Sequence, residues 1–282
     1  MTAFGVQNAS QSKKSARETV AAATRNANAV LREPGALGHM IASLLLCLIL
    51  LITWLTAAEL MEMLTVLLQK KMTSFTAMLA VDLVRWVLSG LLLLLGVMPF
   101  FFGRLRLAGL WMRGRMPELR EMLYFFTSPE RFGRAVMMGL VLILELLLPA
   151  TLSAGLFLGC IELYHGVLLN ALEAAPAMLL FVLALLVAVL ITLLLLLLTF
   201  AVALSTAFAV GNEKLGPWRA VALAASRGFS SFGAVTLFVL LKLGQLLLSL
   251  CTVGILHVLW YGHHHIISYL SFAQTLDQGE TL

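Results

Sequence analysis

Residues Pro99–Arg134 read PFFFGRLRLAGLWMRGRMPELREMLYFFTSPERFGR, and this stretch decides how the rest of the chain is interpreted. It holds seven arginines between two segments that are apolar enough to cross a bilayer. A membrane-spanning helix needs about 20 apolar residues, and loops rich in Lys and Arg stay on the cytoplasmic side. We therefore predict that this loop is cytoplasmic and that both flanking segments lead out through the membrane.

The composition excludes an ordinary water-soluble domain. Of the 282 residues, 61% are hydrophobic and 12% are charged, whereas about a quarter of the residues are charged in soluble domains. The net charge is +5, but Lys and Arg cluster in short stretches between apolar segments. This clustering is typical of topology determinants and of contact with anionic headgroups, so we predict membrane lipids as partners and no nucleic acid.

Apolar segments of spanning length occur six times in the chain. They are residues 40–58, 75–102, 135–161, 177–210, 232–251 and 255–272. The N-terminal tail, the first inner loop and the second inner loop hold five, seven and three Lys or Arg residues, against two in the first outer connection, Lys70 and Lys71. This asymmetry predicts cytoplasmic termini. The predicted fold is all-α, a polytopic transmembrane helix bundle of about six spans.

The domain organisation follows from the same pattern. Residues 1–37 form a basic cytoplasmic tail, residues 38–275 the membrane domain, and residues 276–282 a C-terminal tail. The first tail has no apolar segment of the length that a signal peptide needs. From about Ser15 to Leu31 its pattern predicts a weak helix that ends before Pro34. A partly disordered tail is the alternative.

Two parts of the membrane domain match at a lag of one hundred residues. The matches pair Pro117 with Pro217, Phe132-Gly133 with Phe232-Gly233, and Glu145 with Gln245. They suggest parallel repeats at residues 75–161 and 177–254, each with an entering span, an amphipathic helix opened by proline, and a leaving span. Such repeats occur in transporters and also arise by duplication in structural proteins, so they do not decide the function.

The helices that follow the two prolines are expected to lie in the cytoplasmic membrane interface. In the first, Leu119, Met122, Leu123 and Phe126 are expected to form the apolar face. The candidate contacts with lipid headgroups are Arg104, Arg106, Arg113, Arg115 and Arg120. Their role is either specific binding of anionic lipid or a topology signal with generic headgroup contact.

Charged and polar side chains inside the predicted spans give the sharpest chemical hint, because such residues normally face the protein interior or a water-filled cavity. The candidates are Asp82, Arg85, Glu145, Lys242 and Gln245. Asp82 and Arg85 share one helix face and are expected to neutralise each other. Glu145 and Lys242 each lie about 16 Å along their helix from the cytoplasmic boundary. They form either a polar site at which Glu145 titrates or binds a cation, or a structural ion pair or hydrogen-bonded stripe that fixes helix packing. The polar stripe consists of Lys242, Gln245, Ser249 and Thr252, which fall on one side of their helix.

No motif predicts catalysis. The sequence has no nucleophile elbow, no H-E-x-x-H and no Walker A motif. The consecutive residues His263, His264 and His265 do not converge on one ion, because neighbouring positions on a helix point about 100° apart. We predict no enzymatic activity, no metal and no cofactor.

Short motifs along most of the chain resemble a known family. They are Pro99-x-x-x-Gly103-Arg104, Arg113-Gly114-x-x-Pro117, Glu213-Lys214-x-x-x-Trp218 with Ser226 downstream, and Thr252-Val253-Gly254-Ile255 before Leu259-Trp260. From about Arg17 onward, the chain resembles an uncharacterised family of bacterial six-span membrane proteins known only as a domain of unknown function. The resemblance implies a bacterial cytoplasmic membrane and a largely helical fold, without a substrate or a catalytic residue. The chain departs from the family pattern at residues 262–265.

The sequence leaves two functions open. The first is a non-enzymatic membrane component that binds anionic lipid or a protein partner through its basic interfacial helices. The alternative is a transporter or permease-like carrier that uses the region of Glu145 and Lys242. A polar cavity that reaches both side chains would favour transport, whereas a closed pair among apolar side chains would favour the first function.

Overall fold

The computed structural model describes residues 15–171, 173–252 and 254–278. These residues are almost entirely helical, and no strand occurs among them. Five helical segments in this part of the chain are long and apolar enough to cross a membrane: Ala36–Gln69, Phe75–Met112, Pro129–Leu168, Ala174–Gly211 and Phe232–Cys251. The predicted all-α membrane fold is confirmed. The predictions for Lys13, Lys14, Val253 and residues 279–282 lie outside the described residues.

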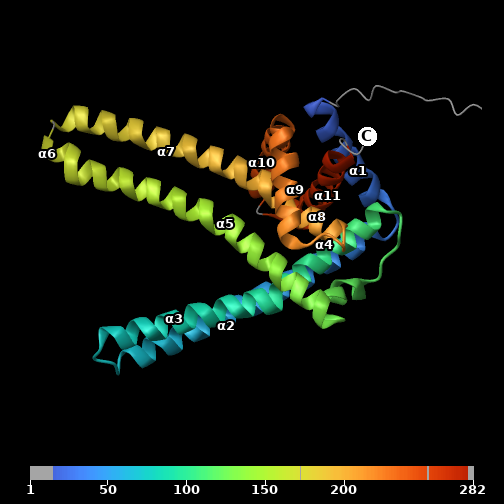
Figure 1. Cartoon of the computed structure of the whole chain (residues 1–282), viewed down its shortest axis with the longest axis horizontal. Coiled ribbons are helices and arrows are strands. Elements are labelled where there is room, and N and C mark those ends of the chain that lie inside the picture. Colours follow the sequence, from blue (N-terminus) through green and yellow to red (C-terminus); the bar gives the residue numbers. More distant parts are fainter. Residues whose placement is uncertain (1–14, 172, 253, 279–282) are drawn as a thin grey trace, which may run out of the picture.

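Two long helical hairpins leave one end of the molecule and diverge (Figure 1). The first consists of α2 (Ala36–Gln69) and α3 (Phe75–Leu92). The second consists of α5 (Pro129–Leu163) and α7 (Ala174–Ala203), with η3 (Tyr164–Leu168) and α6 (Leu169–Ala171) at its tip. We call these two hairpins the arms, and the region where they meet the junction.

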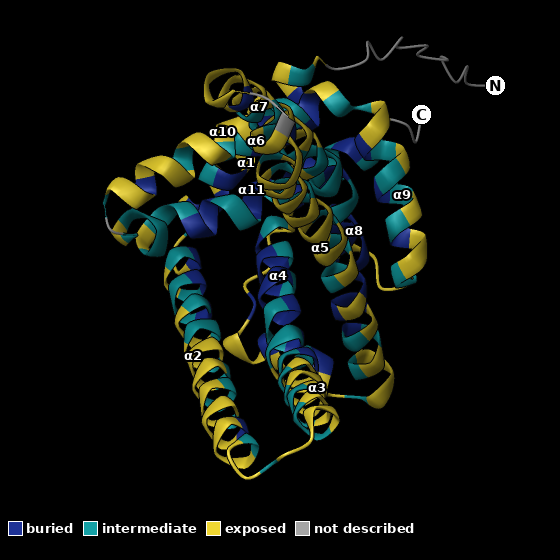
Figure 2. Ribbon diagram, turned by 90° about the vertical axis from the view of Figure 1, so that its left-hand side faces the viewer, coloured by how far each residue is buried: buried dark blue, intermediate teal, exposed yellow. Residues whose placement is uncertain are grey.

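The buried core lies at the junction and not along the arms (Figure 2). It is built mainly from α1 (Ala16–Arg32), α4 (Met98–Met112), α8 (Ser205–Gly211) and α11 (Gly262–Gln278). The arms instead expose many large apolar side chains, and Leu183 is 57% exposed. A water-soluble protein rarely exposes contiguous apolar surface on this scale, so the arms are suited to hydrocarbon.

The N-terminal helix is fixed by local signals. Ser15 accepts a hydrogen bond from the backbone N–H of Glu18, and the Glu18 side chain accepts one from the Ser15 N–H, which is a complete capping box. At the other end, Gly35 has a φ of 81°, in the left-handed region that favours glycine. α1 packs along α11. Residues 16–32 form a helix, where the sequence predicted one for this part of the tail.

Two predicted spans are longer than a bilayer crossing needs, and they continue as helices into the core. The segment Phe75–Met112 passes from α3 through η1 (Leu93–Val97) into α4, and its 38 residues are about 57 Å long, against about 30 Å of hydrocarbon. The segment Ala174–Gly211 likewise continues past Leu204 into α8, where residues 205–210 are all buried. The expectation that the fourth span tilts or projects inward is met by projection into the junction.

The sixth predicted span, residues 255–272, is not among the five candidate spans and is a correction to the predicted count. These residues form η4 (His257–Tyr261) and most of α11. α11 buries polar as well as apolar side chains, including Ser268 and Phe272. A helix with this mixed surface finds its hydrogen-bond partners in protein and packs on α1, whereas a lipid-facing helix has to be apolar all round.

The two short helices that follow the prolines differ from each other. α9 (Pro217–Ser230) begins at its proline, as predicted. Residues Leu119–Phe126 instead form the 3-10 helix η2, in which residues three apart share a side. Met122 and Phe125 are therefore buried, while Leu123 and Phe126 are exposed, so the single apolar face predicted with α-helical spacing is wrong. The two segments predicted as repeats share the order span, short helix, span, and their common origin stays a prediction.

Candidate functional site

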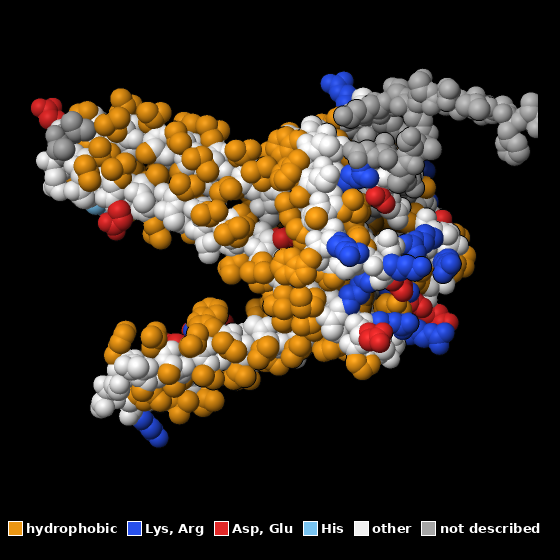
Figure 3. Space-filling model, viewed as in Figure 1, with side chains coloured by type: hydrophobic (Ala, Val, Ile, Leu, Met, Phe, Trp, Pro, Cys, Tyr) orange, Lys and Arg blue, Asp and Glu red, His pale blue; other side chains and the backbone are white. Residues whose placement is uncertain are grey.

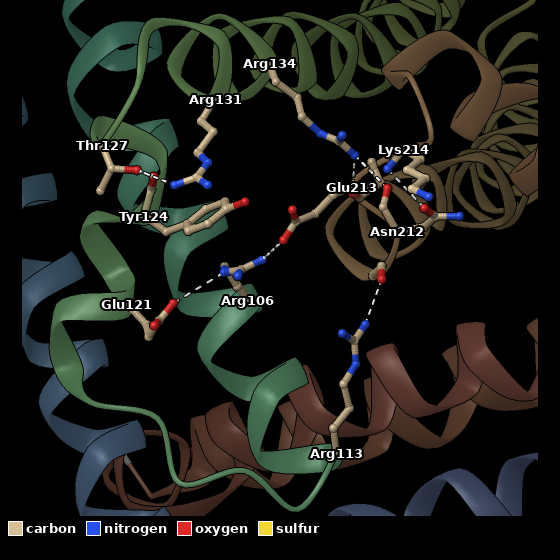
Figure 4. Close-up of polar contacts among 12 residues, drawn as sticks. Arg106, Arg113, Glu121, Tyr124, Thr127, Arg131, Arg134, Asn212, Glu213 and Lys214 are labelled. Atoms are coloured by element: carbon tan, nitrogen blue, oxygen red, sulfur yellow. Dashed lines mark hydrogen bonds and ion pairs between the residues drawn. The ribbon is translucent and has the colours of Figure 1, made fainter.

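A cluster of arginines joins the elements of the junction (Figure 4). Arg106 on α4 donates hydrogen bonds to Glu213, in the loop after α8, and to Glu121 on η2 at 3.5 Å. Its guanidinium also lies 3.5 Å from the centre of the Tyr124 ring, and that of Arg131 on α5 lies 4.2 Å from the same ring. Cation–π contacts and ion pairs thus connect α4, η2, α5 and the loop after α8.

Two further arginines close the C-terminal end of α8. Nη2 of Arg134 lies 2.6 Å from the carbonyl oxygen of Ala209, 2.7 Å from that of Asn212 and 2.9 Å from that of Leu215. Arg113 donates to the Gly211 carbonyl at 2.7 Å. The last carbonyls of a helix lack partners within the helix and attract cations. These two guanidinium groups therefore act as a C-terminal cap supplied by other helices.

The arginine cluster borders a hollow of about 280 Å³ that is lined by Arg106, Arg131, Arg134, Glu130, Glu213 and Tyr124, among others. Burial raises the pKa of Glu213, but hydrogen bonds from Tyr124 and Arg106 outweigh this effect, so the pKa lies below its ordinary value. Burial first, and then the hydrogen bond to Glu213, raise the pKa of Tyr124. The charges of this cluster are therefore largely balanced inside the protein.

The structure corrects two of the five predicted headgroup contacts. Arg104 is 6% exposed, and its Nη2 lies 3.2 Å from Nδ1 of His263 on α11. Arg106 is paired with acids as described, and its side chain is 18% exposed. Both arginines were assigned to a loop by their charge, but α4 continues through them and turns them into the core. Arg113, Arg115 and Arg120 are exposed.

Exposed cations gather near the arginine cluster, on the loop after α4, on η2, in the loop after α8 and on α9. We call them the basic face, which consists of Arg113, Arg115, Arg120, Lys214 and Arg219. Arg120 pairs with Glu118 at 2.9 Å, and no other ion pair involves these five residues within the described chain. Figure 3 shows Lys and Arg side chains concentrated at the junction end of the molecule.

Large apolar side chains are exposed next to these cations. Met116, which follows Arg115, is 76% exposed, and Trp218, which precedes Arg219, is 59% exposed. Sequence reasoning did not include Lys214 and Arg219 among the site residues. The signal that indicates them is the neighbouring tryptophan, because aromatic and basic residues together are typical of membrane interfaces.

The charges on the first arm form a cluster that connects its two helices. Asp82 and Arg85 lie 3.8 Å apart, in agreement with the predicted pair on one helix. The shorter contact of Arg85, however, is with Glu62 on α2 at 2.8 Å. Asp82 in turn accepts a hydrogen bond of 2.9 Å from Gln69 on α2. Sequence reasoning missed Glu62 and Gln69, because pairing within a helix can be read from spacing and pairing between helices cannot.

Glu145 and Lys242 do not meet. Glu145 on α5 accepts a hydrogen bond of 2.9 Å from Ser205 on α8. Lys242 on α10 (Phe232–Cys251) donates to Gln245 at 3.2 Å and to Ser268 on α11 at 3.0 Å. No ion pair within the described residues joins Glu145 to Lys242, so the predicted structural ion pair is wrong. Gln245 does lie beside Lys242, as the predicted polar stripe requires.

A cavity of about 320 Å³ lies at the base of the arms and is lined by residues of α4, α5, α7, α8, α10 and α11. We call it the junction cavity. Lys242 and His265 line it, Glu145 does not, and most of the other lining side chains are apolar. The arrangement matches neither of the two outcomes expected from the sequence, a polar cavity that reaches both charges or a closed pair.

Comparison of the chain with family models, with curated proteins and with solved structures found no match. The resemblance to the uncharacterised bacterial family therefore stays a prediction, and the functional argument rests on the geometry alone.

Proposed function

We propose that the protein is a non-enzymatic, multi-pass membrane component that binds anionic lipid headgroups through the basic face. We further propose that this face lies on the cytoplasmic side of a bacterial cytoplasmic membrane. The observation that carries the proposal is the combination of exposed cations, of which Arg120 alone has an acidic partner among the described residues, with exposed large apolar side chains at the end of the molecule where the arms begin.

The geometry supports headgroup binding in two ways. Arg115 and Arg219 have no acidic partner among the described residues, and their neighbours Met116 and Trp218 are exposed. Apolar side chains of this kind enter the boundary between headgroups and acyl chains, while adjacent guanidinium groups reach phosphate oxygens. This combination favours a lipid surface over a protein partner, which was the other predicted occupant.

The orientation is supported by the position of the chain ends. α1 and α11, the first and last helices of the described chain, pack together at the junction end (Figure 1), where Figure 3 shows most of the Lys and Arg side chains. Lys70 and Lys71 lie between α2 and α3 at the far tip of the first arm. Positive residues are enriched in cytoplasmic segments, which favours a cytoplasmic location for the junction and both termini. Both ends on one side require an even number of crossings, so in this proposal the four helices of the arms cross the bilayer and α10, the fifth candidate span, does not.

The alternative, a carrier that uses Glu145 and Lys242, has less support. The two side chains bind different partners, and the junction cavity reaches only Lys242. A pathway for a polar solute needs polar groups along its length, whereas the described lining of this cavity is mostly apolar.

The test compares binding of short-chain phosphatidylglycerol and phosphatidylcholine to the detergent-solubilised protein by microscale thermophoresis. The variant is the double substitution Arg115→Gln and Arg219→Gln. Each basic residue near an anionic surface contributes about 1 kcal/mol, so we expect the double variant to bind phosphatidylglycerol roughly thirtyfold more weakly. Binding of phosphatidylcholine should stay unchanged.

The matched control is Lys70→Gln with Lys71→Gln, which removes the same charge from two exposed residues at the opposite end of the molecule. This control should bind phosphatidylglycerol as the wild type does. Equal losses in both double variants would show that total charge matters and the basic face does not. Equal affinity of the wild type for the two lipids would refute headgroup recognition itself.

A further inference from the structure

The junction cavity contains a charged group that the proposed function does not use. Its wall is made largely of apolar side chains, including Leu142, Phe200 and Phe238. Among the described residues that line it, Lys242 alone carries a formal charge, and the other polar groups are those of His265, Thr206 and Tyr269. An ammonium group in a mostly apolar cavity of a membrane protein is costly and marks a candidate binding site.

The partners of Lys242 are all neutral. Its Nζ lies 3.2 Å from Oε1 of Gln245, 3.2 Å from Nδ1 of His264 and 3.0 Å from Oγ of Ser268. No carboxylate of the described chain lies within 4 Å of it, because each ion pair there involves other residues. The three N–H groups are thus satisfied as donors, while the positive charge has no counter-ion.

An anion that enters the cavity can replace one of these neutral acceptors. A hydrogen bond between an ammonium and a carboxylate is shorter and stronger than one to a neutral oxygen, so this exchange is favourable. The rest of such a ligand has to be apolar, because the rings of Phe200 and Phe238 lie side by side, with centroids 5.7 Å apart. Nζ of Lys242 is 5.2 Å from the centroid of Phe238, which places the charge at the edge of the apolar wall.

The size and position of the cavity fit a ligand that arrives from the bilayer. Its volume of about 320 Å³ lies within the usual range of ligand sites, about 300–1,000 Å³. It lies at the base of the arms, whose apolar surfaces diverge from the junction (Figure 1). A molecule dissolved in the hydrocarbon therefore meets the junction as it moves between the arms.

We propose that the junction cavity binds a single-chain amphiphilic carboxylate, such as a long-chain fatty acid, with its carboxylate on Lys242 and its chain against Phe200 and Phe238. This site is separate from the basic face and does not depend on headgroup binding there.

The test uses a photoreactive dodecanoic acid with the protein in phosphatidylcholine nanodiscs, and maps the labelled peptides by mass spectrometry. We expect labels on peptides of α7 and α10 that line the junction cavity. Dodecanoate should displace the label from the wild type, and dodecanol, which has the same chain without the charge, should need a concentration roughly tenfold to a hundredfold higher. Equal displacement by the two compounds would overturn the proposal, as would labels confined to the outer parts of the arms.

Two variants separate the charge from the space. Lys242→Met should require roughly tenfold more dodecanoate or higher for displacement, while Lys70→Met, at the far tip of the first arm, should behave as the wild type. Ala203→Phe fills the cavity from α7 and should abolish labelling with Lys242 intact. If Lys242→Met does not fold, Ala203→Phe and the comparison of dodecanoate with dodecanol on the wild type still decide the question.

Failure here is distinguishable from failure of the proposed function. The double variant Arg115→Gln and Arg219→Gln should leave displacement by dodecanoate unchanged, because neither residue lines the junction cavity. A change of tenfold or more in that variant would show that dodecanoate binds at the basic face and would refute the cavity as its site.

Discussion

At Gly103, α4 approaches the backbone of η2 too closely for a Cβ atom, so replacement of this glycine tests how the junction is packed. A Cβ atom on Gly103 would lie 2.2 Å from the carbonyl oxygen of Met122 and 2.8 Å from the Met122 Cα. Both are backbone atoms, so a change of rotamer cannot relieve the clash. Overpacking of this kind costs about 1–3 kcal/mol, whereas alanine in place of glycine within a helix gains up to about 1 kcal/mol. Gly103→Ala should therefore be destabilised or, at best, neutral.

Gly109 on the same helix provides the control. A Cβ atom there would have nothing within 4 Å, so Gly109→Ala receives the same gain in helix propensity without a clash. The propensities cancel when the two variants are compared, and the difference is the packing cost of about 1–3 kcal/mol. For a chain of this size the midpoints should differ by roughly 2–12 °C, at about 2–4 °C per kcal/mol. Thermal unfolding in detergent, followed by intrinsic fluorescence, measures this difference. Midpoints within about one degree of each other would refute the close contact.

Three further predictions concern charge. Arg134→Met should lower the free energy of unfolding by about 1–3 kcal/mol, because three carbonyls lose their donor. Arg131→Met removes an exposed guanidinium and should lower it by less than about 1 kcal/mol. Unfolding curves measured in parallel show which variant is the less stable. The pKa of Glu213 is depressed in the folded protein, so its carboxylate stabilises the fold above its unfolded pKa of 4.5. This stabilisation is lost as the pH falls through the folded pKa. The midpoint of thermal unfolding should therefore fall less steeply with acid in Glu213→Gln than in the wild type. Arg115→Cys and Lys71→Cys, in a background without the native cysteines, should react with a membrane-impermeant maleimide from opposite sides, and reaction from one side alone would contradict the proposed topology.

The sequence predicted the arms better than the junction, and for a physical reason. Solvation by hydrocarbon depends on local composition, so hydropathy identifies Ala36–Gln69 and Pro129–Leu168 directly. The helical continuation through Arg104 depends on contacts of α4 with α8 and α11, which come from distant parts of the chain. Charge alone therefore placed Arg104 in a loop. The prediction of a sixth span at residues 255–272 failed for the same reason. The polar surface of this segment is covered by α1, which lies far away in the sequence.

The contacts of the candidate site residues were predictable only where both side chains lie on the same helix. Asp82 and Arg85 were paired correctly because helical spacing places them on one face. An ion pair of Glu145 and Lys242 was one of the alternatives that their shared depth suggested, but depth does not determine the direction in which each side chain points. Ser205 and Ser268 occupy the positions where a partner charge was expected. No local sequence pattern predicts that either serine is a hydrogen-bond partner.

The two arms are held together in different ways, and this difference follows from their sequences. Helices surrounded by lipid gain little from the hydrophobic effect when they associate, so hydrogen bonds and close packing between them decide their stability. The first arm uses polar contacts: Trp54 donates to the Ser89 carbonyl at 2.9 Å, and Arg85 pairs with Glu62 at 2.8 Å.

The second arm relies on packing. No hydrogen bond joins α5 to α7 within the described residues, whereas the rings of Tyr164 and Phe181 lie 4.5 Å apart near its tip, and the small residue Ala188 is 2% exposed. Small side chains let two helices approach closely, which favours dispersion contacts over polar ones. Loss of one polar pair should therefore loosen the first arm, while the second should respond to the volume of its small residues.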